Sequence, residues 1–129
     1  MEQKYKICII IFIIFLILDF VMIRYVNNQL YNDQFNLINN GPMDMSNIYS
    51  KLIYGFITYL LMTITLYYFV IKDNKSIYIA MLLGLLIYGV YNGTNIITIN
   101  SYKLKVAILD TLWGTTLFGI TTYLIYKIK

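Results

Sequence analysis

The stretch Tyr91-Asn92-Gly93-Thr94-Asn95 lies inside an apolar segment that runs from Ile77 to Ile99. Two amides, a hydroxyl and a glycine stand there among isoleucine, leucine, valine and tyrosine. The segment is long enough to cross a bilayer as a helix, and in hydrocarbon each polar group needs a hydrogen-bonding partner. It is therefore predicted to be a transmembrane helix whose neighbours supply polar groups at the same depth.

The composition of the whole chain is typical of an integral membrane protein. Of its 129 residues, 60% are apolar and 12% are charged, against about 45–50% and about 25% in soluble domains. The apolar residues gather in blocks that predict helices at about 5–24, 48–71, 77–99 and 105–126. We expect an all-α fold, a four-helix transmembrane bundle with up-down topology, in a single domain over 1–129.

The first apolar segment also fits a signal peptide, because lysines precede it. Its length, the lack of a small-residue cleavage motif and the position of Asp19 inside it favour an uncleaved helix.

The polar residues 25–47 are predicted to be an extramembrane loop, although part of 25–38 fits a helix on the membrane surface equally well. Gly41-Pro42 is a breaker signal, and Asp44 or Ser46 could cap the next helix.

The charges predict the topology. Four crossings place both termini on one side, together with the short turn at 72–76. That side carries Lys4, Lys6, Lys72, Lys75, Lys127 and Lys129, whereas the opposite side carries Arg24, Lys51, Lys103 and Lys105. By the positive-inside rule this excess predicts cytoplasmic termini.

Polar side chains of three predicted helices fall at one depth. At about 1.5 Å per residue, Asp19, Asn92, Asn95 and Asp110 all lie in the half of the membrane away from the termini. Carboxyls inside a membrane are costly and mark candidate functional sites, while the plainer interpretation is hydrogen bonding between helices. Arg24 could pair with Asp110, or could simply extend its charge to the membrane surface.

Glycines predict where helices approach each other. Ala80 and Gly84, then Gly89 and Gly93, form small-xxx-small pairs that suit close packing. The third helix is therefore predicted to be central and packed on more than one side. The predicted packing glycines are Gly84, Gly89, Gly93 and Gly114.

The residue content makes several classes of site improbable. Histidine is absent and Cys8 is the lone cysteine, which removes most zinc sites and the Ser-His triad. We expect no metal and no cofactor, and we assign no catalytic residue. The net charge of +4 comes from lysines that flank apolar segments, so the expected partners are membrane lipids, a second copy or another membrane protein, and not nucleic acid.

Three motifs resemble those of a family of small predicted membrane proteins, domain of unknown function 2177. They are Leu18-Asp19, Tyr91-Asn92-Gly93-Thr94-Asn95 and Asp110-Thr111-Leu112-Trp113-Gly114. The resemblance runs from end to end and marks Asp19, Tyr91, Asn92, Thr94, Asn95, Asp110, Trp113 and Gly114. The chain departs from the family pattern at Met22, where Trp is usual, and at Asn92, where Asp is usual. The resemblance implies a four-span fold and brings no established activity.

Three functions are compatible with these residues. The leading hypothesis is a polar pocket in the outer leaflet that binds a lipid headgroup or another small polar ligand, in a protein that could serve as an accessory subunit. Its predicted residues are Asp19, Tyr91, Asn92, Thr94, Asn95, Asp110 and Trp113. One alternative is an oligomeric transporter with a cation or proton path along Asp19, Asn92 and Asp110. The other is a lipid-modifying enzyme that uses Asp19 and Asp110 as acid and base.

Overall fold

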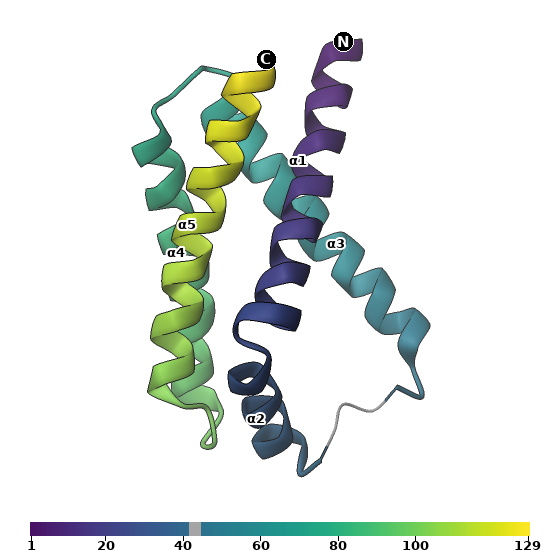
Figure 1. The fold of residues 1–129 in the computed structure, drawn as a ribbon, viewed down its shortest axis with the longest axis vertical. Coiled ribbons are helices and arrows are strands. Elements are labelled where there is room, and N and C mark those ends of the chain that lie inside the picture. Colours follow the sequence, from purple (N-terminus) through teal and green to yellow (C-terminus); the bar gives the residue numbers. More distant parts are fainter. Residues whose placement is uncertain (42–44) are drawn as a thin grey trace.

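The computed structural model describes residues 1–41 and 45–129, and every regular element in those ranges is a helix (Figure 1). The all-α class predicted from the apolar blocks is confirmed. The elements are α1 (Glu2–Val21), the wide π-helical turn η1 (Met22–Val26), α2 (Asn28–Asn39), α3 (Ile48–Leu66), the π-helical turn η2 (Tyr67–Ile71), α4 (Ile77–Thr98) and α5 (Leu104–Ile128).

Three of the described helices are long and apolar enough to cross a membrane: Glu2–Val26, Ile48–Ile71 and Ile77–Thr98. The fourth long helix, α5, has 25 residues but contains more polar side chains. It is also the helix that the others cover, and its buried residues are Val106, Ala107, Gly114, Leu117, Phe118, Gly119, Thr121, Thr122 and Ile125. The central helix of the bundle is therefore α5 and not the third predicted helix, α4, which packs mainly against α5.

Helices α4 and α5 form a closely packed antiparallel pair (Figure 1). Their backbones meet at Gly84 and Gly114, where a Cβ atom added to Gly84 would overlap the Gly114 carbonyl oxygen. The Cα of Gly114 in turn lies against the Tyr88 ring. Small side chains at this crossing let the helices approach closely, as membrane helices require when no hydrophobic effect drives their association.

Helix α1 packs against α5 and α3. The rings of Phe15 and Phe118 lie 5.1 Å apart between centroids, and both side chains are fully buried beside Ile11 and Leu66. Helix α3 crosses the bundle obliquely, so that its beginning lies away from the other helices (Figure 1). This splay opens a space between α3 and the junction of α1 with α2.

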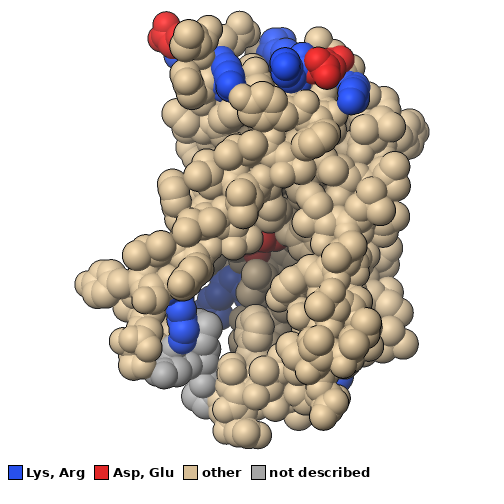
Figure 2. All heavy atoms as spheres, turned by 180° about the vertical axis from the view of Figure 1, so that it is seen from behind, with Lys and Arg blue, Asp and Glu red and all other residues tan. Residues whose placement is uncertain are grey.

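Both chain ends lie at the same end of the bundle (Figure 1). Lys, Arg and acidic side chains gather at that end, and the middle of the visible face is almost free of charge (Figure 2). Many apolar side chains in this middle zone are exposed, among them Ile9, Ile17, Phe56 and Leu86. An apolar belt between charged ends is the surface that a multi-pass membrane protein presents to lipid.

The predicted loop 25–47 contains a helix, α2, which ends at Asn40 in the left-handed conformation (φ 55°). Part of this segment is therefore helical, and its position on the membrane surface stays a prediction. Asn47, and not Ser46, is the N-cap residue of α3. Pro42 and Asp44, which bear the predicted break and cap, lie outside the described residues.

Candidate ligand-binding site

Asp19 lies at the inner surface of α1 with 8% of its area exposed. The Trp113 Nε1–H of α5 donates a hydrogen bond to its Oδ1 at 2.6 Å. The Tyr59 hydroxyl of α3 hydrogen-bonds to its Oδ2. A carboxyl inside the bundle thus ties together three helices, and each of its oxygens has one partner.

Asp110 is the second acid of the cluster, and it lies one helical turn before Trp113 on α5. Its Oδ1 accepts a hydrogen bond from the Tyr31 hydroxyl at 2.7 Å. Its Oδ2 accepts one from the Asn92 amide at 2.8 Å. Burial and the adjacent Asp110 carboxyl raise the pKa of Tyr31 above its usual value, so this hydroxyl is a hydrogen-bond donor at neutral pH and above. Asp110 therefore joins α2 and α4 to α5.

Asn92 is the most heavily bonded of these side chains and is only 1% exposed. Its Nδ2 group lies within hydrogen-bonding distance of the Tyr88 carbonyl (2.9 Å), Asp110 (2.8 Å) and the Thr111 hydroxyl (3.3 Å). Its Oδ1 accepts from the Tyr102 hydroxyl at 2.6 Å. A polar residue in the middle of α4 is thus fully satisfied by its neighbours, as burial in hydrocarbon demands.

The structure brings together only part of the predicted cluster. Tyr91, 59% exposed, and Thr94 point away from it on the outer side of α4. Asn95 is half-buried beside Tyr102. Gly89 lies at ordinary contact distance from Thr111, whereas an added Cβ at Gly93 would meet no described atom within 4 Å. Gly93 therefore does not pack against another helix within the described chain.

Sequence reasoning did not place Tyr31, Tyr59, Tyr102 or Gln34 in the cluster. Tyr31 and Gln34 lie in α2, which the polar composition of residues 25–47 did not mark as part of the bundle, and Tyr102 lies in the turn before α5. Gln34 is 2% exposed; its Nε2–H donates to the Ser101 carbonyl at 3.0 Å, and the Lys103 backbone N–H donates to its Oε1 at 2.8 Å. The available signal was the spacing of Tyr31 and Gln34, which places both on one face of a helix.

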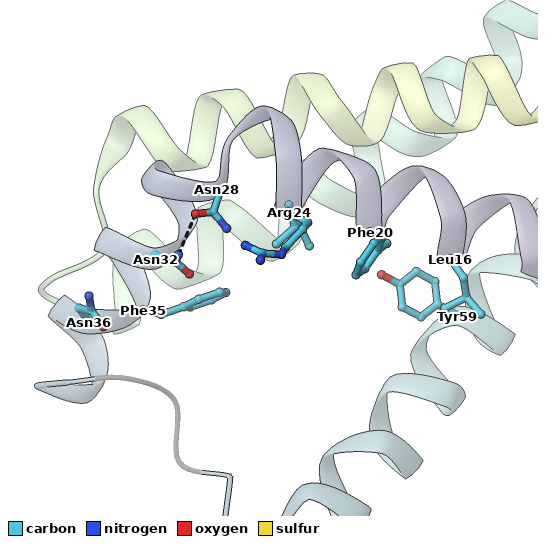
Figure 3. Close-up of a pocket in the computed structure, with 9 residues that line it drawn as sticks. Leu16, Phe20, Arg24, Asn28, Asn32, Phe35, Asn36 and Tyr59 are labelled. Carbon is cyan, nitrogen blue, oxygen red and sulfur yellow. Dashed lines mark hydrogen bonds between the residues drawn. The ribbon is translucent and has the colours of Figure 1, made fainter.

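An open cleft of about 760 Å³ adjoins the network between α1, η1, α2 and α3. Figure 2 shows a hollow on this side of the molecule, and Figure 3 shows the side chains around it. Arg24 projects from the turn after α1, Asn28 and Asn32 project from α2, and Tyr59 comes from α3 (Figure 3). The lining residues are Leu16, Phe20, Ile23, Arg24, Asn28, Asn32, Phe35, Asn36 and Tyr59.

The lining of the cleft is amphipathic. The side chains from α1, Leu16 and Phe20, are apolar, and so are Ile23 of η1 and Phe35 of α2. Helix α2 also contributes three carboxamides. None of the described residues that line the cleft is acidic. Asp110 bonds to Tyr31 and Asn92, so the pairing with Arg24 that the sequence allowed is not formed. Arg24 instead contributes a positive charge to the cleft.

The cluster and the cleft share one residue. Tyr59 lines the cleft, and its hydroxyl bonds to Asp19 in the buried network. The network therefore holds one wall of the cleft in place. Within the described residues, no group of three or more His, Cys, Asp or Glu side chains is arranged to hold a metal ion.

The fold and the site together define a helical, multi-pass integral membrane protein with a buried hydrogen-bond network beside an amphipathic cleft. A family model described as "Predicted membrane protein (DUF2177)" matches residues 5–127. The chain belongs to this family, domain of unknown function 2177. No curated protein and no solved structure matches the chain.

Proposed function

We propose that this membrane protein binds a lipid whose headgroup sits in the cleft between α1, α2 and α3. The observation that carries the proposal is the amphipathic lining. The α1 side chains are apolar, while η1 and α2 contribute the Arg24 guanidinium and three carboxamides beside the apolar Ile23 and Phe35. Its volume of about 760 Å³ lies within the usual range of small-molecule sites, about 300–1,000 Å³. A molecule with a polar head and an apolar tail matches both walls.

The depth of the cleft supports the same ligand. Arg24 stands near the end of the candidate span Glu2–Val26, where a membrane helix leaves the hydrocarbon and reaches the headgroups. Phe20 and Leu16 lie one and two helical turns further along α1, toward the middle of the membrane. A lipid could thus place its headgroup at Arg24 and lay an acyl chain along α1. With cytoplasmic termini, this site faces the outer leaflet.

The buried network has a supporting role in this proposal. Each carboxyl oxygen of Asp19 and Asp110 already has a partner inside the bundle. We therefore assign ligand contact to the cleft residues, and we assign to the two acids the positioning of Tyr59 and α2. An accessory role beside another membrane protein is compatible with this assignment.

The proposal is tested by filling the cleft. Leu16→Trp places a large ring in it, while Ile17→Trp adds the same ring one residue further along, at a side chain that is 56% exposed and does not line the cleft. Lipid retained after purification in mild detergent is measured by native mass spectrometry. We expect Leu16→Trp to lose the retained lipid and Ile17→Trp to keep it. Equal retention in both variants would refute the proposal.

A further inference from the structure

We infer that the lipid is anionic and that Arg24 binds its phosphate group, with the carboxamides of α2 as additional ligands. This inference rests on the proposed function, and it adds the chemical class of the headgroup.

The charge of the cleft comes from Arg24. Among the described residues the ion pair that forms is Glu2 with Lys6, at the other end of α1, and no acidic side chain lines the cleft. The guanidinium is therefore not neutralised by a described carboxylate. An unpaired charge beside hydrocarbon is costly, and an anion bound against it removes part of that cost.

The donors around Arg24 are arranged for an acceptor-rich group. Asn28, Asn32 and Asn36 recur every fourth residue of α2 and all line the cleft. Side chains at this spacing share one face of a helix. Asn32 donates to the Asn28 Oδ1 at 3.1 Å, which orients the Asn28 carboxamide. A guanidinium fork with neighbouring amide N–H groups matches the several acceptor oxygens of a phosphate.

The backbone at Arg24 is itself unusual. Arg24 lies in η1, the π-helical turn between α1 and α2. Single π-helical turns are rare and often occur at functional sites. Of the π-helical turns η1 and η2, only η1 contributes residues to the described lining of the cleft, and Arg24 is one of them.

A zwitterionic headgroup fits less well. Choline or ethanolamine would add a cation, and among the described residues of its lining the cleft holds the cation of Arg24 and no carboxylate. The charge of the cleft therefore favours a headgroup whose net charge is negative, such as phosphatidylglycerol, over one whose phosphate is balanced by an amine.

The test compares lipids and variants in one assay. Protein in nanodiscs or detergent is titrated with phosphatidylglycerol or with phosphatidylcholine, and bound lipid is counted by native mass spectrometry. Wild type is expected to prefer phosphatidylglycerol. Arg24→Gln is expected to weaken phosphatidylglycerol binding about fivefold or more, the usual effect of one basic side chain on an anionic lipid, and Arg24→Lys to weaken it less.

The matched control is Lys105→Gln, which removes one exposed positive charge at the same end of the molecule but outside the cleft. It is expected to leave the preference unchanged. If Arg24→Gln does not fold, Asn32→Asp serves instead, because it adds a repelling charge to the cleft at an exposed residue. Inorganic phosphate and glycerol phosphate are tested as competitors, and we expect neither to displace the lipid.

The outcomes separate the inference from the proposed function. Lipid that binds in the cleft, is lost in Leu16→Trp and shows no headgroup preference would refute the inference and leave the proposed function standing. If Lys105→Gln loses the preference for phosphatidylglycerol as much as Arg24→Gln does, the inference is also refuted, because the preference would then come from the general surface charge. Soluble phosphate that binds as tightly as the lipid would refute a lipid as the source of the anion. If Leu16→Trp binds as much lipid as wild type, both the inference and the proposed function are refuted.

Discussion

At the scale of single residues, every carboxyl oxygen of the buried Asp19 and the half-buried Asp110 has a hydrogen-bond partner. The Asp19 oxygens have Trp113 and Tyr59 as partners, and the Asp110 oxygens have Tyr31 and Asn92. Asn92 stands where the family pattern usually has Asp. Its amide can donate to Asp110, whereas a second carboxylate at that distance would repel it. The Asp110 carboxyl therefore accepts hydrogen bonds from two neutral groups, the Tyr31 hydroxyl and the Asn92 amide.

A pair of substitutions at Asp110 tests this account. Asp110→Asn keeps the shape, since its oxygen can accept from Asn92 and its amino group can donate to the Tyr31 oxygen. Asp110→Leu removes both acceptors: the buried Tyr31 hydroxyl is left without its acceptor, at about 1 kcal/mol or more, and the Asn92 Nδ2 group keeps only the Tyr88 carbonyl and the Thr111 hydroxyl. We expect the midpoint of thermal unfolding in detergent to fall little in Asp110→Asn and clearly in Asp110→Leu. Equal losses in both variants would show that the charge, and not hydrogen bonding, holds the network.

At the scale of elements, the crossing of α4 and α5 is the tightest contact in the described chain. It depends on Gly84 and Gly114, because a Cβ atom at either position would overlap α5 backbone or the Tyr88 ring. Gly93 is on the same helix as Gly84, but it faces open space. The sequence pattern could not distinguish them, since both belong to small-xxx-small pairs.

This difference predicts opposite effects of one substitution. Gly84→Ala should destabilise the protein by about 1–3 kcal/mol, the usual cost of overpacking, because the atom that it meets is backbone and cannot turn aside. Gly93→Ala should cost nothing and could add up to about 1 kcal/mol through lower backbone entropy in the unfolded chain. Thermal unfolding of the two variants in the same detergent checks this. A loss at Gly93 equal to that at Gly84 would mean that Gly93 packs against a partner, such as a second copy.

Helix α2 is the element held by the fewest contacts. Gln34 joins it to the turn before α5 through Ser101 and Lys103, and Tyr31 joins it to Asp110. One wall of the cleft therefore depends on two side chains. Gln29, an exposed residue in the first turn of the same helix, offers a matched comparison.

We expect Gln34→Ala to release α2 while Gln29→Ala leaves it docked. The loss of two hydrogen bonds with a buried side chain should speed amide hydrogen exchange within residues 28–39 about tenfold. Exchange is followed by mass spectrometry of peptides from this segment. Unchanged exchange in Gln34→Ala would show that Tyr31 and apolar contacts suffice to hold the helix.

At the scale of the whole molecule, the two chain ends lie together and the 72–76 turn lies with them, as an even number of crossings requires (Figure 1). Cytoplasmic termini stay a prediction from the lysine excess at that end. The cleft, with Arg24, belongs to the other half of the molecule.

Labelling of single cysteines checks the topology. In a Cys8→Ser background, Asp73→Cys and Asn100→Cys place a thiol at exposed residues of opposite turns. A membrane-impermeant maleimide added to intact cells should label Asn100→Cys and not Asp73→Cys. Labelling of both from the same side would contradict four crossings, and labelling of Asp73→Cys alone would reverse the predicted orientation.

The sequence by itself determined the class of the protein and the depth of its polar residues. Apolar blocks of membrane length predict helices because hydrocarbon leaves the backbone no other partner, and the boundaries of the α4 helix agree closely with the block 77–99. Asp19, Asn92 and Asp110 could be placed at one depth because a helix rises by a constant distance per residue.

Only the tertiary structure decided which groups meet at that depth. Helical rotation and tilt depend on contacts between helices far apart in the sequence, so Tyr91 and Thr94 turn outward while Tyr31, Tyr59 and Tyr102 turn inward. The role of α2 was hidden because a polar helix that docks through a few buried side chains has the composition of a loop. The cleft arises from the oblique course of α3, a global property that no local pattern of residues contains.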